Sequence, residues 1–349
     1  MELKKLLKDL CNAFGPSGFE EDVRALIREQ VEPIADKVEE DALGNMTAWK
    51  KGESDRVVLI DAHTDEVGIM ISHVDDKGFL RFATLGGWDA RQFPGTRVTL
   101  KTKSGFVPGA IGFTPPHITK PEERSKAIPT ENLAIDIGVK SKDEAAELGI
   151  VPGTPGILDG PFVSLPGNRA MAKAFDDRAG CAAAIKVMEE FSDTKLPFTL
   201  AVNFATSEEL GLRGAKVSSY RIAPEIALVL ETTTAGDFPG VPGHLSPCIM
   251  SDGVALTVAD RTMLTSPKML RFLQEVAQKN EIPHQLKQPL FGGTNAGEIH
   301  LSRSGVLTGV LAVPGRYIHG PSSVIDLHDL DCMIKLAIAA IKEIPKRLM

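Results

Sequence analysis

VVLIDAHTD, at residues 57–65, begins as an almost wholly apolar run and ends in polar residues. A run of this kind is typical of a strand buried on both faces of a parallel sheet. Four similar runs begin later, at Phe198, Ile226, Val254 and Val306. Helical stretches begin between or after them at Ala179, Leu210, Ser266 and about Leu327. This alternation predicts an α/β fold with a mostly parallel, doubly wound sheet and helices on both faces.

The pattern changes between residues 68 and 166, where short strands alternate with glycine turns. Such spacing is typical of an antiparallel or barrel structure. We therefore predict a small β-barrel-like domain at 68–166, inserted into an α/β domain made of 1–67 and 167–349. Within the insertion, residues 114–131 contain four prolines and no periodicity. Long irregular loops are often functional, so His117 in this loop is a candidate substrate contact.

Composition narrows the classes of function. The 349 residues are 43% hydrophobic and carry a net charge of -7, so the chain can bury a large core and lacks the basic surface that binds nucleic acid. No apolar stretch is long enough for a membrane span, and the N-terminus has helical periodicity rather than a signal peptide pattern. We expect a soluble, cytoplasmic protein. The scattered Cys11, Cys181, Cys248 and Cys332 are predicted to be reduced core thiols.

Acidic and histidine residues follow several of the buried runs. Because open α/β sheets bind ligands at the carboxyl ends of their strands, these side chains are expected to converge. Two histidines and several carboxylates, without cysteine, form a nitrogen and oxygen ligand set for zinc, cobalt or manganese. The residues at strand ends or at the start of the Ala179 helix are His63, Asp65, Asp176, Asp177, Glu208, Glu209, Glu231 and His319.

Each residue also has a simpler interpretation. Asp176 and Asp177 could cap a helix, as could Ser207 with Glu208 and Glu209, and a single histidine at a strand end is often structural. These interpretations would have to coincide at five separate places. Asp65 is two residues beyond His63 and is a plausible partner for the second ring nitrogen of that histidine. Adjacent glutamates point in different directions, so one is expected to bind metal and the other to move protons.

Four motifs resemble metallopeptidase family 42, the tetrahedral (TET) and glutamyl aminopeptidases of the dinuclear-zinc exopeptidase clan. They are AHTDEVG, AFDDRAG, ATSEELGLRGA and RYIHGP, at residues 62–68, 174–180, 205–215 and 316–321. The resemblance implies removal of residues from the free N-terminus of peptides. It also implies a metal-bridging water as nucleophile, a dimerising inserted domain, and dimers that assemble into a hollow tetrahedral dodecamer. In that assembly the loop at 114–131 would reach a neighbouring subunit.

The resemblance also implies roles for individual residues. Asp176 would bridge two divalent ions, zinc or cobalt, with manganese also possible, and its peptide bond to Asp177 would be cis. His63 and Glu231 would complete one metal site, and Glu209 and His319 the other. Glu208 would be the general base and then the general acid, with Asp65 as a further catalytic residue.

Three positions depart from the family pattern. Glu231 stands where aspartate is common, which leaves Asp237 as an alternative ligand. Asn295 replaces a frequent aspartate near the substrate pocket and is a second candidate substrate contact. Gly320 replaces the usual serine.

Three other functions compete with the aminopeptidase. The nearest is a dinuclear deacylase or amidase that acts on blocked amino acids. A glycoside hydrolase of the endoglucanase type also uses paired carboxylates. The chain has only two tryptophans and two tyrosines, however, which are few aromatic rings to stack on sugars. A non-catalytic scaffold would be expected to have lost ligands or base, and none of the six core positions is lost.

Overall fold

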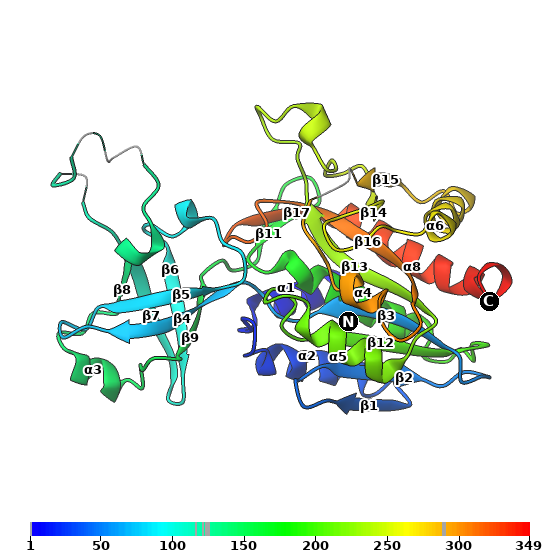
Figure 1. Ribbon diagram of the computed structural model, residues 1–349, viewed down its shortest axis with the longest axis horizontal. Helices are drawn as coiled ribbons and strands as arrows, with labels where there is room; N and C mark the ends of the chain where they lie inside the picture. Colours follow the sequence, from blue (N-terminus) through cyan, green and yellow to red (C-terminus); the bar gives the residue numbers. More distant parts are fainter. Residues whose placement is uncertain (1, 116, 121, 123–125, 288–290) are drawn as a thin grey trace.

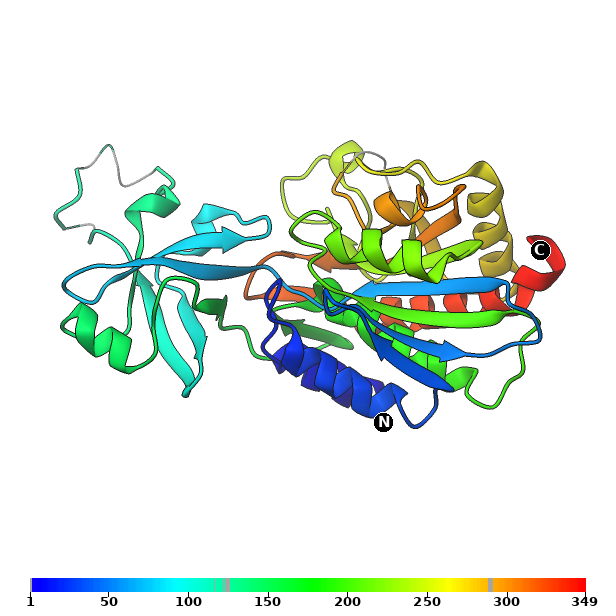
Figure 2. The same ribbon diagram turned by 60° about the horizontal axis from the view of Figure 1, so that its bottom comes forward.

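The computed structural model describes residues 2–115, 117–120, 122, 126–287 and 291–349. Its two parts are a large α/β body and a smaller β-barrel, which lie side by side (Figures 1 and 2). The loop predicted at 114–131 protrudes from the barrel, and positions 116, 121 and 123–125 of that loop lie outside the described residues.

The centre of the body is the predicted parallel sheet. Strands β12 (Thr199–Ala205), β3 (Val57–His63), β13 (Ile226–Thr234) and β16 (Leu307–Arg316) are adjacent and pair in parallel. Successive side chains of a strand point to opposite faces. Accordingly Val58 and Ile60 belong to one apolar cluster, and Leu59 between them belongs to another. The doubly covered sheet expected from the apolar runs is confirmed.

Antiparallel strands extend this sheet on both sides. The hairpin β1 (Lys37–Glu40) and β2 (Met46–Lys50) forms one edge. Beyond β16 the order continues through β17 (Ser323–Asp326), β11 (Arg169–Ala172) and β10 (Val163–Leu165). The expectation that the Val254 run forms a parallel strand is wrong. This run is β14 (Val254–Thr257), which pairs antiparallel with β16 and parallel with β15 (His284–Lys287), because the chain reverses direction in the loop after β13.

Helices cover both faces of the sheet. One face packs against α1 (Leu3–Asn12), α2 (Glu21–Val31), α4 (Phe175–Glu190), α6 (Pro267–Lys279) and α8 (Leu327–Arg347). The other face packs against α5 (Arg213–Ile222) and α7 (Ala296–Ile299). All four cysteines are buried and free, as predicted. Within the described residues, no helix is both long and apolar enough to cross a bilayer.

The inserted domain is a closed antiparallel barrel. Its strands, in spatial order, are β4 (Gly68–Val74), β5 (Leu80–Leu85), β8 (Ala134–Asp136), β7 (Gly105–Gly112), β6 (Arg97–Thr102) and β9 (Pro155–Leu158). The helix α3 (Lys142–Glu147) precedes β9, and the barrel has its own apolar core, which includes Ile71, Leu100 and Ile135. The barrel ends earlier than the predicted boundary at residue 166, because β10 pairs with β11 in the large sheet.

Candidate metal centre

The predicted ligands come from five different chain segments. His63 is the last residue of β3, and Glu231 lies within β13. Glu208 and Glu209 lie in the turn after β12, Asp176 opens α4, and His319 lies in the turn after β16. These segments meet at the carboxyl edge of the parallel strands, which is where such sheets place their ligands.

The structure brings these side chains into two groups that share Asp176, and a third potential group joins His63, Glu208 and Glu209. Nε2 of His63 lies 3.1 Å from Oδ1 of Asp176 and 3.5 Å from Oε1 of Glu231. Nε2 of His319 lies 3.2 Å from Oδ2 of Asp176 and 3.1 Å from Oε1 of Glu209. In each group the potential ligand atoms all lie within 4.8 Å of one another. The two oxygens of Asp176 thus face two neighbouring sites, each completed by one imidazole and one further carboxylate.

The charge of the cluster fits divalent cations. Burial raises the pKa of Glu231 to about 7, and burial together with nearby carboxylates raises the pKa of Glu208 well above its usual value. Burial lowers the pKa of His319, but hydrogen bonds to Asp176 and Glu209 outweigh this and raise it to about 11. Burial of several carboxyl groups together thus disfavours their negative charges, which bound cations would neutralise. The oxygen and imidazole donors of the cluster are those that zinc, cobalt and manganese accept.

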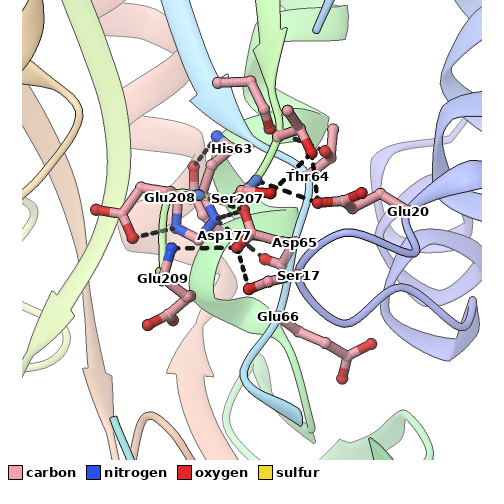
Figure 3. A network of polar contacts seen from close by, with 12 residues as sticks. Ser17, Glu20, His63, Thr64, Asp65, Glu66, Asp177, Ser207, Glu208 and Glu209 are labelled. Carbon is pink, nitrogen blue, oxygen red and sulfur yellow. Dashed lines mark hydrogen bonds and ion pairs between the residues drawn. The ribbon is translucent and has the colours of Figure 1, made fainter. Parts of the chain in front are cut away.

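Asp65 connects the two loops that carry the ligands (Figure 3). Its Oδ1 accepts a hydrogen bond from the backbone N–H of Glu208 at 2.9 Å, and its Oδ2 accepts one from the N–H of Glu209 at 3.1 Å. Its Oδ1 also lies 3.3 Å from Nδ1 of His63, and that nitrogen is 3.0 Å from the Asp65 carbonyl oxygen. Asp65 is fully buried. It is therefore placed to orient His63 and the Glu208 turn, as expected of the partner of a ligand.

Two residues that the sequence analysis missed support this arrangement. The hydroxyl of Ser17 donates to Oδ2 of Asp65 at 2.6 Å. Oε1 of Glu20 accepts hydrogen bonds from the Thr206 hydroxyl at 2.5 Å and from the Ser207 N–H at 3.1 Å. Both side chains are buried. The sequence shows only a Gly-Pro-Ser-Gly turn before the amphipathic helix α2, and the polar residues of this turn were the one available signal.

The peptide bond between Asp176 and Asp177 is cis, which confirms the expectation from the family resemblance. The Asp177 carboxylate points away from the two groups and accepts hydrogen bonds from the N–H of His63 at 3.2 Å and of Gly180 at 2.9 Å. The two adjacent aspartates thus have separate tasks. Asp176 faces the potential metal sites, and Asp177 holds the end of β3 against the start of α4.

The remaining candidates, Asp237, Asn295 and His117, lie outside the two ligand groups. Asp237 forms an ion pair with Arg316 and belongs to neither group, so Glu231 is the ligand candidate of this region. Asn295 is fully buried and donates to Asp61 at 2.8 Å, whereas the neighbouring Thr294 lines the cavity. A direct substrate contact by Asn295 therefore does not fit its position. His117 is exposed on the protruding barrel loop and does not line the cavity beside the cluster.

A cavity of about 650 Å³ opens beside the cluster. Two of its lining residues were not singled out in the sequence: Lys287, at the end of β15, and Gln92, on the barrel loop after β5. The same loop touches a ligand candidate, since Nδ1 of His319 lies 2.8 Å from the carbonyl oxygen of Gly87. The barrel therefore contributes to the cavity wall.

Comparisons with known proteins agree with this geometry. The family model for M42 glutamyl aminopeptidase matches residues 44–336. The lysyl aminopeptidase of Pyrococcus furiosus is 32% identical over 97% of this chain and 97% of its own, and the glutamyl aminopeptidase of Lactococcus lactis is 32% identical over 94% and 93%.

Solved structures extend the likeness to the whole fold. A TET aminopeptidase from a marine sediment thaumarchaeon is 40% identical, covering 98% of this chain and 96% of its own, with a TM-score of 0.95. A TET1 peptidase of Pyrococcus horikoshii, which can assemble into a tetrahedron or a large octahedral shell, is 31% identical over 97% and 98%, with a TM-score of 0.86. The matched residues include every member of the two ligand groups, and the chain belongs to the M42 glutamyl aminopeptidase family.

Proposed function

We propose that this aminopeptidase removes single residues from the free N-terminus of peptides with the help of two divalent ions. The sharing of Asp176 between two ligand groups is the observation that carries the proposal. His63 and Glu231 would hold one ion with Asp176, and Glu209 and His319 would hold the other. Such ions polarise the scissile carbonyl and activate water near neutral pH. Zinc and cobalt suit the imidazole and carboxylate donors best, with manganese possible.

Glu208 is the proposed general base and acid. Oε2 of Glu208 lies 4.0 Å from Nε2 of His63, and the side chain is nearly buried at the cavity wall. Its backbone is fixed by Asp65, so its carboxylate has a defined direction. It would take a proton from the attacking water and deliver it to the departing amine.

The variant Glu208→Gln tests this role. It removes the proton acceptor without changing the size of the side chain, so we expect two metals per chain as in the parent and a turnover lowered by about 10²–10⁴-fold. Metal content is measured by atomic emission and turnover with an aminoacyl anilide. Parent-like turnover would remove Glu208 from the mechanism.

A panel of blocked and free substrates separates this function from its rivals. The proposal expects hydrolysis of free dipeptides, loss of that activity after chelation, and no hydrolysis of their N-acetylated forms. A deacylase or amidase would cleave the acetylated forms instead. An endoglucanase would act on cellulose, for which the cavity is poorly equipped, because Phe291 is the one aromatic side chain among its described lining residues.

Lys287 indicates the preferred first residue. Its side chain is 4% exposed, lines the cavity, and forms no ion pair within the described part of the chain. An unpaired buried cation is costly unless a ligand supplies the opposite charge. We propose that the cavity favours an acidic N-terminal residue, in line with the name of the glutamyl relative and in contrast to that of the lysyl relative.

The variant Lys287→Met tests this preference. A charged hydrogen bond of about 1.5–3 kcal/mol predicts that kcat/KM for a glutamyl substrate falls by about 10- to 100-fold relative to a leucyl substrate. Lys268→Met, at an exposed position of α6, is the matched control. An unchanged ratio of glutamyl to leucyl rates would contradict the preference and leave the aminopeptidase function intact.

We also propose that the chain forms dimers and that these assemble into a tetrahedral dodecamer. A TET1 relative can likewise assemble into a tetrahedron. Several large apolar side chains are exposed, among them Phe238 and Tyr317, whose rings pack edge to face at 5.9 Å. Exposed patches of this kind mark interaction surfaces. Light scattering that returned the 37.5 kDa of a single chain would contradict self-association.

A further inference from the structure

We propose that the inserted barrel completes the substrate site in its own chain, and that Gln92 binds the peptide unit that follows the scissile bond. The inference rests on the proposed aminopeptidase function and adds a contact for the departing part of the substrate. It depends on the loop at residues 86–92, which follows β5 and ends in the short 3-10 helix Ala90–Gln92.

This loop is pressed against the metal cluster. The carbonyl oxygen of Gly87 lies 2.8 Å from Nδ1 of His319, where it can fix the orientation of the imidazole. Gly86 has a φ of +84°, and a Cβ added there would lie 3.2 Å from Cβ of Glu209. The loop therefore lies against His319, in the turn after β16, and against Glu209, in the turn after β12. These two contacts define its position relative to the cluster.

Gln92 is the residue of this loop with an unused polar group in the cavity. It is half-buried and lines the cavity with His319 and Asp176. Its backbone N–H donates to the carbonyl of Asp89, but its side-chain amide has no hydrogen-bond partner among the described residues. A primary amide offers both a donor and an acceptor. This combination matches the C=O and N–H of a peptide unit and does not require charge.

Gly320 makes room for this side chain. A Cβ at position 320 would lie 2.0 Å from Oε1 of Gln92, so any other residue there would displace the glutamine. The atom that would be struck is the end of a flexible side chain, so the displacement would cost the fold little. A serine at this position would thus move Gln92 away, so the place of the Gln92 amide in the cavity depends on Gly320.

The position of Gln92 indicates which part of the substrate it meets. Lys287, the proposed partner of the first residue, belongs to β15, whereas Gln92 belongs to the barrel. Both side chains line the same cavity, and the candidate metal ligands lie among its other lining residues. With the first side chain bound at Lys287, we assign the next peptide unit to the other unused polar group of the cavity, the Gln92 amide. Substrates that end at an anilide after the first residue lack the peptide unit that Gln92 would bind.

The test compares a tripeptide with an aminoacyl anilide that has the same first residue. The metal-loaded enzyme is assayed as the parent and as Gln92→Ala, Gly320→Ala and the double variant. Loss of one neutral hydrogen bond of about 1 kcal/mol predicts that Gln92→Ala lowers the tripeptide-to-anilide ratio of kcat/KM by about fivefold. Gly320→Ala should lower the ratio similarly by displacing Gln92, and the double variant should be no worse than Gln92→Ala alone.

Gln278→Ala, at an exposed position of α6, is the matched glutamine control. A ratio within twofold of the parent in Gln92→Ala, or additive losses in the double variant, would overturn the inference while the aminopeptidase function stands. If the parent enzyme hydrolyses neither substrate, the proposed aminopeptidase function is contradicted. The proposed role of Gln92, which depends on that function, is then contradicted as well.

Discussion

Asn295 shows how a single residue adapts the core beneath the cluster. Its amide donates to Oδ2 of Asp61, and Asn203 donates to Oδ1 of the same carboxylate at 2.6 Å. Asp61 is fully buried in β3, two residues before His63, and burial raises its pKa to about 6. The departure from aspartate at position 295 therefore supplies a donor where a second carboxylate would repel Asp61. Its effect concerns the support of β3 rather than the substrate.

Asn295→Asp is expected to destabilise the fold. It replaces a donor by an acceptor beside the buried Asp61, leaving both carboxylates without this hydrogen bond, at a cost of about 1–3 kcal/mol. The urea midpoint at pH 8 measures the change, with an unaltered slope as a check on two-state unfolding. Asn168→Asp, at an exposed position, is the control. A midpoint shift no larger than that of the control would contradict this account of Asn295.

At the scale of elements, the segment before α2 supports two loops that carry candidate site residues. Ser17 reaches the loop after β3 through Asp65, and Glu20 reaches the loop after β12 through Thr206 and Ser207. The segment also pairs with the β3 loop by backbone hydrogen bonds, since Glu66 donates to the carbonyl of Gly15 at 3.0 Å. A turn near the N-terminus thereby fixes the direction of Glu208.

Glu20→Ala tests this support. It leaves the Thr206 hydroxyl and the Ser207 N–H without their buried acceptor, which costs about 1–3 kcal/mol for each group and frees the turn that carries Glu208. We expect kcat to fall by more than about tenfold while KM for an aminoacyl anilide changes little, since small misplacements of catalytic groups lower rate strongly.

The neighbouring Glu21→Ala is the control, because the Glu21 side chain is 60% exposed and forms a loose ion pair with Arg24. Equal effects of the two substitutions on kcat, or a loss confined to KM, would mean that Glu20 has no positioning role.

The elements that the sequence predicted well are those with a strong local signal. The apolar runs of β3, β12, β13 and β16 and the glycine-punctuated barrel identified both parts of the chain, because burial on two faces and tight turns each leave a distinct pattern. Strand direction was less accessible, so β14 was misplaced as parallel. An isolated apolar run of four residues does not specify the direction of its partner.

The candidate site followed the same rule. His63, Glu209, Glu231 and His319 were accessible because they end or follow apolar runs, and Asp176 because it opens a helix. The four motifs then implied which of these residues would form each metal site. The sequence did not reveal Ser17, Gln92 and Lys287. Tertiary contacts between segments distant in sequence bring these residues to the cluster. A hydrogen bond between residues 17 and 65 leaves no periodicity to detect.

At the scale of the whole molecule, the cluster links folding to metal and pH. In the metal-free protein, the folded chain keeps protons on Glu231, with a pKa of about 7, and on His319, with a pKa of about 11. An unfolded chain releases these protons near pH 4.3 and 6.5. Because the folded state binds more protons in both cases, its stability falls as pH rises, from about 4 to 7 through Glu231 and from about 6.5 to 11 through His319.

Metal binding should reverse this trend. Divalent ions replace the protons on the same side chains, so their affinity increases with pH, and they bind the folded chain in preference to the unfolded one. At a free metal concentration about a thousandfold above Kd, the stabilisation is about 4 kcal/mol. Thermal unfolding of the chelated and zinc-loaded protein at pH 5.5 and 8 measures it. We expect the metal to raise Tm by several degrees more at pH 8 than at pH 5.5, and a metal effect that is equal at both pH values would show that the six cluster side chains do not release protons to a bound ion.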